Sequence, residues 1–333
     1  MAQANLQETV NCPWCKASFD IEPASSASCF KCPACSAASS LGSLRNPDHR
    51  PEALEIAKWG ALAVTADLDR HTGAYAYRDI HNGKEYIGSG TFVQIGNRLL
   101  LATVGHTEPK DGTVTLVKKS ALLLPEPISC VIRRVVNKNR GIDVGVFELT
   151  ADAADRAGLE PIGIDRIHDG GTGNPGTKAR LIGYPCQFVM TAPPLPNVRR
   201  FHALSYGCEP IESARWQAIP DNEKVWFDEQ VHIAIEFSDD VISYDNSLPV
   251  PEGTPEPFGM SGGGIWQRPT PTEDDAIWNP HDHCLFGIQS AWMRKGSFLR
   301  LIQIIHWLKL VADEYPDLCG ELESRFPRLR QMR

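Results

Sequence analysis

The sequence lacks any apolar run of the length that a membrane-spanning helix needs, which is about 18 residues or more. Its first ten residues, MAQANLQETV, contain neither the basic region nor the apolar region of a secretory signal peptide. We therefore expect a cytoplasmic, unprocessed protein with no membrane partner.

Positive charge is also scarce. The 33 lysines and arginines are outnumbered by 41 aspartates and glutamates, which gives a formal net charge of −8. Proteins that bind nucleic acids need dense positive charge against the phosphates, so the composition argues against a nucleic-acid partner. Of the 333 residues, 42% are hydrophobic and 22% are charged, which excludes disorder throughout. The length suits two domains, or one large domain with a small appendage.

The ten cysteines are not spaced like a disulfide framework. Five of them lie between residues 12 and 35, and clustering of this kind is typical of a metal site. In a reducing compartment we expect the other five to be small buried hydrophobic residues. These are Cys130, Cys186, Cys208, Cys284 and Cys319.

Two Cys-x-x-Cys knuckles, CPWC and CPAC, are separated by 16 residues near the N-terminus. Each knuckle places two thiolates on one tight turn, and two knuckles supply the four tetrahedral ligands that Zn²⁺ prefers. We therefore predict a zinc ribbon over residues 1–45 that is held together by a structural zinc ion. Its expected role is to dock a protein partner, and contact with nucleic acid is the second alternative. Cys29 also lies three residues before Cys32 and could replace one of the ligands. The predicted ligands are Cys12, Cys15, Cys32 and Cys35.

From about residue 60 the sequence changes to short β-rich runs separated by glycine, proline and asparagine, as in all-β folds. Residues 46–59 form the expected linker. Helical patterns occur only over 151–158 and 298–312, and the second has apolar residues at helical spacing. The predicted strands are 86–95, 98–104, 113–117, 128–136, 144–149, 179–184, 231–237 and 285–290.

A serine between glycines stands near the end of the β-rich region, in the segment FGMSGGGIW. This serine, Ser261, also fits the G-x-S-x-G nucleophile elbow of the α/β-hydrolases, in which the acid and the histidine follow the serine. That elbow opens a helix, whereas further glycines and prolines follow Ser261, and only 72 residues remain for later strands and triad partners. We therefore reject the α/β-hydrolase interpretation.

A histidine and an aspartate precede Ser261 in settings that suit catalysis. His106 ends the apolar run RLLLATVGH, and Asp143 stands at the head of the apolar run GIDVGVFEL. Together with IGSGTFV, these segments resemble in their order the trypsin-like serine peptidases, which have the chymotrypsin fold. The runs RLIGYP and LFGIQSA match two further strands of that family, so the resemblance covers about residues 60–300.

The resemblance implies a role for each motif residue. Ser261 resembles the nucleophile, His106 the general base that takes its proton, and Asp143 the carboxylate that orients the imidazole. The backbone amides of Gly259 and Ser261 would form the oxyanion hole. No metal or organic cofactor is implied for this chemistry, and the substrate would be a protein or peptide.

The same resemblance implies a mainly β fold with two antiparallel six-stranded β-barrels that meet at a cleft. We expect a peptidase domain over 60–300, with barrels at about 60–160 and 175–297. A C-terminal helix and a basic tail should follow over 298–333, with the apolar face of the helix packed on the second barrel.

Departures from the family bear on activity and specificity. Met260 stands where the family has the acid that pairs with a new N-terminus after zymogen cleavage, so activity would be constitutive or controlled by a partner. Pro255 stands where trypsin-like enzymes have the floor of the substrate pocket, which leaves an Arg or Lys preference without a counter-charge. Trp292 falls at the rim, where a bulky side chain favours small substrate residues; the alternative is that Trp292 simply packs on the barrel. The expected pocket residues are Pro255, Phe258, Ser290 and Trp292.

The sequence thus predicts an intracellular serine endopeptidase that works through an acyl-enzyme and is gated or targeted by a protein partner. The alternative is a catalytically silent module that recognises proteins through the barrel cleft and the zinc ribbon. The ordered presence of Ser261, His106 and Asp143 favours the enzyme, because a scaffold has no physical need to keep all three.

Overall fold

The computed structural model describes residues 8–11, 17–21, 30–34, 38–39, 63–78, 85–107, 115–117, 131–133, 141–169, 179–186, 190–192, 195–200, 203–211, 227–243, 256–268, 280–293 and 298–332. The expected linker, the candidate pocket residue Pro255 and four of the candidate zinc ligands lie outside these residues. Those four ligands are Cys12, Cys15, Cys29 and Cys35. Within the described part, no helix is long and apolar enough to span a membrane.

The chain divides into two compact units, which comprise Met1–Asp67 with Thr270–Asp282 and Leu68–Pro269 with His283–Arg333. The first unit contains two small antiparallel hairpins. Cys32, the one candidate zinc ligand that the structure describes, directly follows a hairpin strand and is 1% exposed. The hairpins pair β1 (Glu8–Asn11) with β2 (Ser18–Ile21) and β3 (Phe30–Lys31) with β4 (Ala38–Ser39).

A six-stranded antiparallel sheet forms from the first apolar runs of the second unit. Its core buries the aromatic rings of Tyr75, Phe92 and Phe147 against helix α3 (Ala151–Ala157). The α3 boundaries are set locally, because Thr150 caps the first turn and Gly158 ends the helix at a left-handed φ of 62°. In pairing order the strands are β8 (Thr115–Val117), β5 (Thr72–Arg78), β6 (Glu85–Ile95), β7 (Arg98–Thr103), β10 (Gly145–Leu149) and β9 (Val131–Arg133).

The expected closure of this first sheet into a barrel is not confirmed. Its edge strands are β8 and β9, and no pairing between them occurs among the residues that the structure describes. The segments that flank both edge strands in sequence, 108–114, 118–130 and 134–140, lie outside those residues.

The second six-stranded sheet is a closed antiparallel barrel. Apolar side chains from all six strands fill its interior, and they include Leu181, Tyr206 and Ile265. A short hairpin of β12 (Met190–Ala192) and β13 (Leu195–Arg200) pairs separately. Around the barrel the strands are β11 (Ala179–Gly183), β14 (Leu204–Pro210), β15 (His232–Ser243), β18 (Phe298–Gln303), β17 (Cys284–Met293) and β16 (Gly264–Gln267).

The prediction of a helix starting at about residue 298 is wrong. Residues Phe298–Gln303 form β18, which pairs with β15 on one side and β17 on the other and thereby closes the barrel. The apolar pattern here suits a helix and a doubly buried strand equally, and Leu299, Leu301 and Ile302 are all fully buried. Long-range pairing decides between the two, so the barrel extends six residues beyond the expected boundary at 297.

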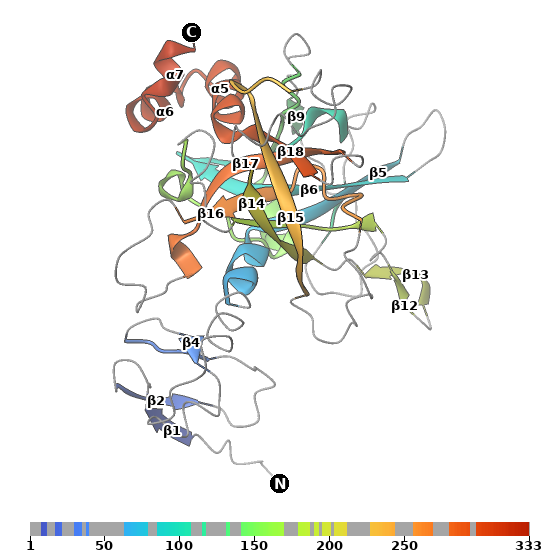
Figure 1. The fold of residues 1–333 in the computed structure, drawn as a ribbon, viewed down its shortest axis with the longest axis vertical. Helices are drawn as coiled ribbons and strands as arrows, with labels where there is room; N and C mark the ends of the chain where they lie inside the picture. Colours follow the sequence, from blue (N-terminus) through green and yellow to red (C-terminus); the bar gives the residue numbers. More distant parts are fainter. Residues whose placement is uncertain are drawn as a thin grey trace. The chain divides into compact units, whose positions relative to one another are not determined.

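The helix begins only at Ile304, and three helices complete the chain. They are α5 (Ile304–Glu314), α6 (Cys319–Arg325) and α7 (Arg328–Gln331), which lie together at the C-terminal end (Figure 1). As expected, α5 packs its apolar face on the barrel, against β17 and β18, but it also contacts β10 of the other sheet. Arg98 of β7 joins this region by ion pairs to Glu148 and Asp317 and by stacking on Tyr315.

Other short helical segments connect the strands. Residues 63–70 are helical, and short 3₁₀ turns occupy Gly105–Thr107, Ile164–Arg166 and Pro280–Asp282.

Candidate active site

His106 lies in the 3₁₀ turn Gly105–Thr107 directly after β7. The strand end before it is enclosed and hydrogen-bonded, since Thr103 is fully buried and its hydroxyl bonds the Tyr75 hydroxyl at 2.8 Å. Tyr75 also bonds Thr107, on the other side of the histidine. The His106 side chain is 48% exposed, so a buried scaffold presents it to solvent.

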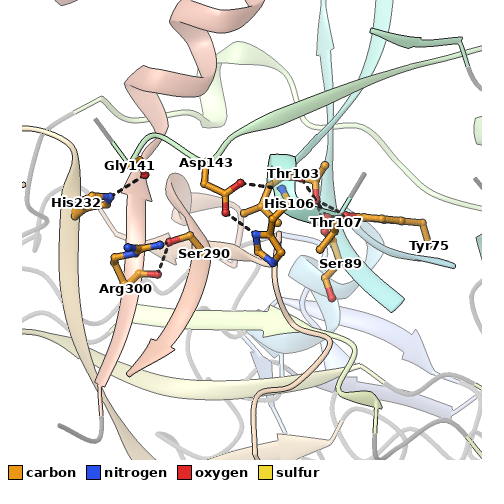
Figure 2. Close-up of polar contacts among 11 residues, drawn as sticks. Tyr75, Ser89, Thr103, His106, Thr107, Gly141, Asp143, His232, Ser290 and Arg300 are labelled. Atoms are coloured by element: carbon orange, nitrogen blue, oxygen red, sulfur yellow. Dashed lines mark hydrogen bonds and ion pairs between the residues drawn. The ribbon is translucent and has the colours of Figure 1, made fainter. Parts of the chain in front are cut away.

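Asp143 stands two residues before β10. Because β10 pairs antiparallel with β7, with Gly145 opposite Thr103, the start of β10 lies beside the end of β7. One carboxylate oxygen of Asp143 accepts from the His106 backbone N–H at 2.8 Å, and the other lies 2.5 Å from His106 Nδ1 (Figure 2). A carboxylate can only accept, so Nδ1 carries the proton and Nε2 is left as the basic nitrogen.

The charge of Asp143 is stabilised by its neighbours. Burial raises its pKa, but the hydrogen bonds and charge of His106, together with the charge of Arg300, outweigh this effect and leave the pKa below the ordinary value. Asp143 is therefore an anion at neutral pH. Arg300 lies on β18 and is itself partly buried, which lowers its pKa, whereas the charge of Asp143 raises it.

Ser261 lies in the turn that precedes β16. Its carbonyl oxygen accepts from the Ser89 N–H of β6 at 2.9 Å, and the Gly262 N–H donates to the Gln289 carbonyl of β17 at 2.8 Å. Gly262 has a φ of 91°, and a Cβ there would lie 2.0 Å from the Ser89 carbonyl oxygen and 2.2 Å from Thr103 Oγ1. Glycine is therefore required at position 262. The turn that carries Ser261 and Gly262, called the serine turn below, lies directly on β6 and on the end of β7 that leads to His106.

The structure brings His106 and Asp143 into direct contact, and it packs the serine turn against the strand that carries the histidine. Within the described residues, however, no hydrogen bond joins the Ser261 hydroxyl to the His106 ring. The expected dyad contact is therefore present, and the expected nucleophile-to-base contact is not made.

The expected oxyanion amides belong to two peptide groups whose carbonyls are held by other hydrogen bonds. The Phe258 carbonyl accepts from the Cys186 N–H at 2.7 Å, and the Met260 carbonyl accepts from the Gly263 N–H at 2.7 Å. In a trans peptide the N–H points opposite to the carbonyl, so the amides of Gly259 and Ser261 point away from these partners. Neither amide donates a hydrogen bond to any acceptor in the described part of the chain.

Three of the expected pocket residues are described. Phe258 is 50% exposed, and its ring meets that of Trp292 edge to face with centroids 5.6 Å apart. Trp292 also packs against the barrel core. The Ser290 hydroxyl donates to the Arg300 carbonyl at 3.1 Å and accepts from Arg300 Nε at 3.2 Å.

The expectation that the single cysteines are buried is correct for only one of those that the structure describes. Cys208 is buried, whereas Cys284 and Cys319 are half-buried and Cys186 is exposed. Cys186 follows the end of β11 in sequence and lies outside the barrel ladder. Its backbone N–H donates to the Phe258 carbonyl, in the segment that leads to Ser261. Cys130 lies outside the described residues.

Sequence reasoning missed the polar residues behind Asp143. His232 of β15 reaches the Gly141 carbonyl with Nε2 at 3.2 Å, and Trp307 of α5 donates to the Gly145 carbonyl at 3.1 Å. Arg300 could have been noticed as a lone charge in the apolar run FLRLI. His232 and Trp307 carry no local signal, because their partners are 91 and 162 residues away in the chain.

No protein family and no curated protein matches the chain. Solved structures similar to it include GrC, at 13% identity and a TM-score of 0.45, covering 73% of this chain and 94% of that one. The protease Anisep from Arthrobacter nicotinovorans is 15% identical with a TM-score of 0.39, covering 70% of this chain and 90% of that one. The serine endoprotease from Yersinia pestis is 12% identical with a TM-score of 0.44, covering 80% and 67%. At these values the comparisons assign no activity to this chain.

Proposed function

We propose that this protein is an intracellular serine endopeptidase of the trypsin-like type, with Ser261 as nucleophile, His106 as general base and Asp143 as the orienting carboxylate. The observation that carries the proposal is the two-point contact between Asp143 and His106. It fixes the imidazole with Nε2 as the proton acceptor, which is the tautomer that nucleophile activation requires. The serine turn, packed on the strand that carries His106, supports the assignment of Ser261.

The proposed reaction is acyl transfer from a protein or peptide substrate. His106 Nε2 takes the Ser261 proton while the serine oxygen forms a bond to the scissile carbonyl carbon. The amides of Gly259 and Ser261 stabilise the negative charge on the carbonyl oxygen. His106 then gives its proton to the departing amine as the C–N bond breaks, and water releases the acyl group by the same route in reverse. No metal or organic cofactor takes part.

The Ser261-to-His106 hydrogen bond has to form before this reaction can start. Catalytic hydrogen bonds are often long or misaligned in unliganded enzymes and tighten when substrate binds. Met260, in place of the family's activating acid, removes the zymogen route to such tightening. We therefore propose that substrate, or a protein partner that gates the site, completes the contact.

A second candidate is a catalytically silent module that binds proteins through this surface. It is favoured because no hydrogen bond joins the Ser261 hydroxyl to the His106 ring within the described residues.

The test that separates the two candidates is to treat the full chain with a fluorophosphonate probe and to map the adduct by mass spectrometry. The enzyme predicts a single adduct on Ser261, lost in His106→Ala because the base is gone. An adduct on another residue, or labelling that is unchanged in His106→Ala, would refute the triad. A chain that takes no label, with or without casein as a protein substrate, would support the binding module.

For specificity, we propose a preference for small residues at the cleaved bond. The paired rings of Phe258 and Trp292 support this, because bulk at the rim narrows the space for a substrate side chain. The pocket position Pro255 supplies no charge that would favour lysine or arginine.

We further propose that residues 1–45 form a zinc ribbon that docks a protein partner. In sequence, each Cys-x-x-Cys pair begins directly after the first strand of a hairpin, at Cys12 after β1 and at Cys32 after β3. Thiolates on such turns suit tetrahedral Zn²⁺, and the buried position of Cys32 agrees with a ligand role. Zinc would hold together a segment that is too small to form its own apolar core.

Metal analysis of the purified full chain is expected to find about one zinc per chain. Replacing Cys12 and Cys15 together with serine should abolish the zinc, because two thiolates cannot complete the tetrahedral site. Cys208→Ser, in the barrel interior, is the matched control and should retain the metal. A reduced wild-type chain without zinc would contradict the ribbon.

A further inference from the structure

The segment that carries Asp143 is not held by the strand ladder. Pairing of β10 with β7 begins at Gly145, so residues 141–144 make no ladder contacts. Two ring N–H groups bond carbonyls on either side of the aspartate, one at Gly141 within this segment and one at Gly145, the first residue of the ladder. His232 Nε2 lies 3.2 Å from the Gly141 oxygen, and Trp307 Nε1 lies 3.1 Å from the Gly145 oxygen. The two carbonyls stand two residues before and two residues after Asp143.

The direction of the His232 hydrogen bond follows from its other ring nitrogen. The Asp228 backbone N–H lies 2.9 Å from His232 Nδ1, and a backbone N–H can only donate. Nδ1 is therefore unprotonated, and Nε2 carries the hydrogen that is donated to Gly141 (Figure 2). His232 is 1% exposed, so this tautomer is enclosed in the barrel wall.

His232 stays neutral at physiological pH. Burial, the charge of Arg300 and the charge of His306 lower its pKa, the Gly141 carbonyl and Asp228 act in the opposite direction, and the net result is a pKa of about 4. A neutral ring makes one donor and one acceptor contact, which matches the two partners present. His232 therefore acts as a fixed link from β15 to the Asp143 segment, with no change of charge in the working pH range.

Trp307 makes the corresponding link from α5. Its ring is fully buried, and an indole nitrogen can only donate. Gly145, whose carbonyl it bonds, is also in close contact with the residues before His106. A Cβ at Gly145 would lie 3.0 Å from the Val104 oxygen and 3.4 Å from the Gly105 Cα. A shift of Gly145 would therefore alter the position of His106 as well as that of Asp143.

We propose that His232 and Trp307 are positioning residues that hold the Asp143 segment in register with His106 from the C-terminal half of the chain. This inference rests on the proposed function, because it assigns the two rings to the alignment of its dyad. Neither ring touches the reacting atoms. Their contribution is geometric, and Asp143 meets His106 through two hydrogen bonds that a displaced segment could not keep together.

The test uses Trp307→Phe, which keeps an aromatic ring and removes the donor N–H. Trp266→Phe is the matched control, because Trp266 is also fully buried and its Nε1 has no hydrogen-bond partner in the described part of the chain. The first readout is the NMR chemical shift of the His106 Nδ1 proton in the free full-length protein, which reports the hydrogen bond from this proton to Asp143. The charge of Asp143 acts on His106, and the charge of Arg300 acts on Asp143. Asp143 and Arg300 are both kept in every variant.

In Trp307→Phe this chemical shift is expected to move upfield, because the Nδ1 proton loses its close carboxylate acceptor. Labelling of Ser261 by the fluorophosphonate is expected to slow by about 10- to 100-fold, because small misplacements of catalytic groups lower reaction rates by about this factor. Trp266→Phe should change neither quantity. Equal behaviour of the two tryptophan variants would overturn the proposal, because a merely structural role predicts lost stability in both.

His232 variants keep the proposal testable if Trp307→Phe does not fold. His232→Gln retains an N–H for the Gly141 carbonyl and should preserve the chemical shift of the His106 Nδ1 proton, whereas His232→Leu removes the donor and should move this signal upfield. An upfield shift in both variants, or in neither, would contradict the positioning role. The NMR readout needs no turnover. A wild-type chain that is never labelled but whose His106 responds as described would refute the peptidase and leave the positioning role standing.

Discussion

Asp143→Asn is expected to slow acylation of Ser261 by a fluorophosphonate about 10⁴-fold at pH 7 while the chain stays folded. Both carboxylate oxygens are in use, one by the His106 backbone N–H and the other by Nδ1. An asparagine offers one acceptor oxygen and one NH₂ donor, so it can satisfy only one of these two donors.

Each orientation of the asparagine damages the site. If its oxygen accepts from the ring, its NH₂ faces the backbone N–H of His106, and the segment must move apart. If its oxygen accepts from the backbone, its NH₂ donates to Nδ1 and forces the ring proton onto Nε2. That tautomer cannot take the Ser261 proton, so the nucleophile is not activated.

The measurement is the pseudo-first-order labelling rate, with circular dichroism to check folding. Asp165→Asn makes the same chemical change at an exposed position in the 3₁₀ turn Ile164–Arg166 and should label at the wild-type rate. A labelling rate for Asp143→Asn within about tenfold of wild type would show that Asp143 does not orient the base.

Gly262→Ala is expected to destabilise the fold by about 4 kcal/mol or more, or to displace the serine turn and abolish labelling. The added Cβ would overlap the Ser89 carbonyl oxygen at 2.0 Å and Thr103 Oγ1 at 2.2 Å, and both belong to buried strands that cannot move away. The backbone conformation, with φ at 91°, is also one that alanine rarely adopts.

Urea unfolding measures the free energy of unfolding, and the rate of Ser261 labelling by the fluorophosphonate shows whether the candidate active site is intact. Gly320→Ala, in α6, is the control, since a Cβ there meets nothing within 4 Å. It should raise the free energy of unfolding by about 0.5–1 kcal/mol, because alanine favours the helix over the unfolded chain. Wild-type stability and wild-type labelling in Gly262→Ala would show that the turn does not lie against β6 and β7 as described.

The strands around the candidate site could be predicted because their signals are local. The runs that became β6, β7 and β10 combine apolar side chains with nearby glycine or asparagine, which is enough to define a strand and to place its ends to within one residue. The contact between His106 and Asp143 follows from the same information. Both stand at strand ends, and the antiparallel pairing of β7 with β10 brings those ends together.

Local patterns were insufficient where a residue is buried on every side. Residues 298–303 have an apolar spacing that fits a helix, and they form a barrel strand only because β15 and β17 offer them backbone partners. Those partners come from residues far apart in sequence. No window around residue 298 contains the information that selects the strand.

The sequence by itself determined the order of His106, Asp143 and Ser261, the mainly β character and the two Cys-x-x-Cys knuckles, since each is a matter of residue type and short spacing. Only the tertiary structure decided where β18 ends and α5 begins, and that His232 and Trp307 bond the carbonyls on either side of Asp143. These hydrogen bonds join residues 91 and 162 positions apart. Such contacts depend on how the barrel and its following helix pack on the first sheet, and packing of that kind leaves no periodic trace in the chain.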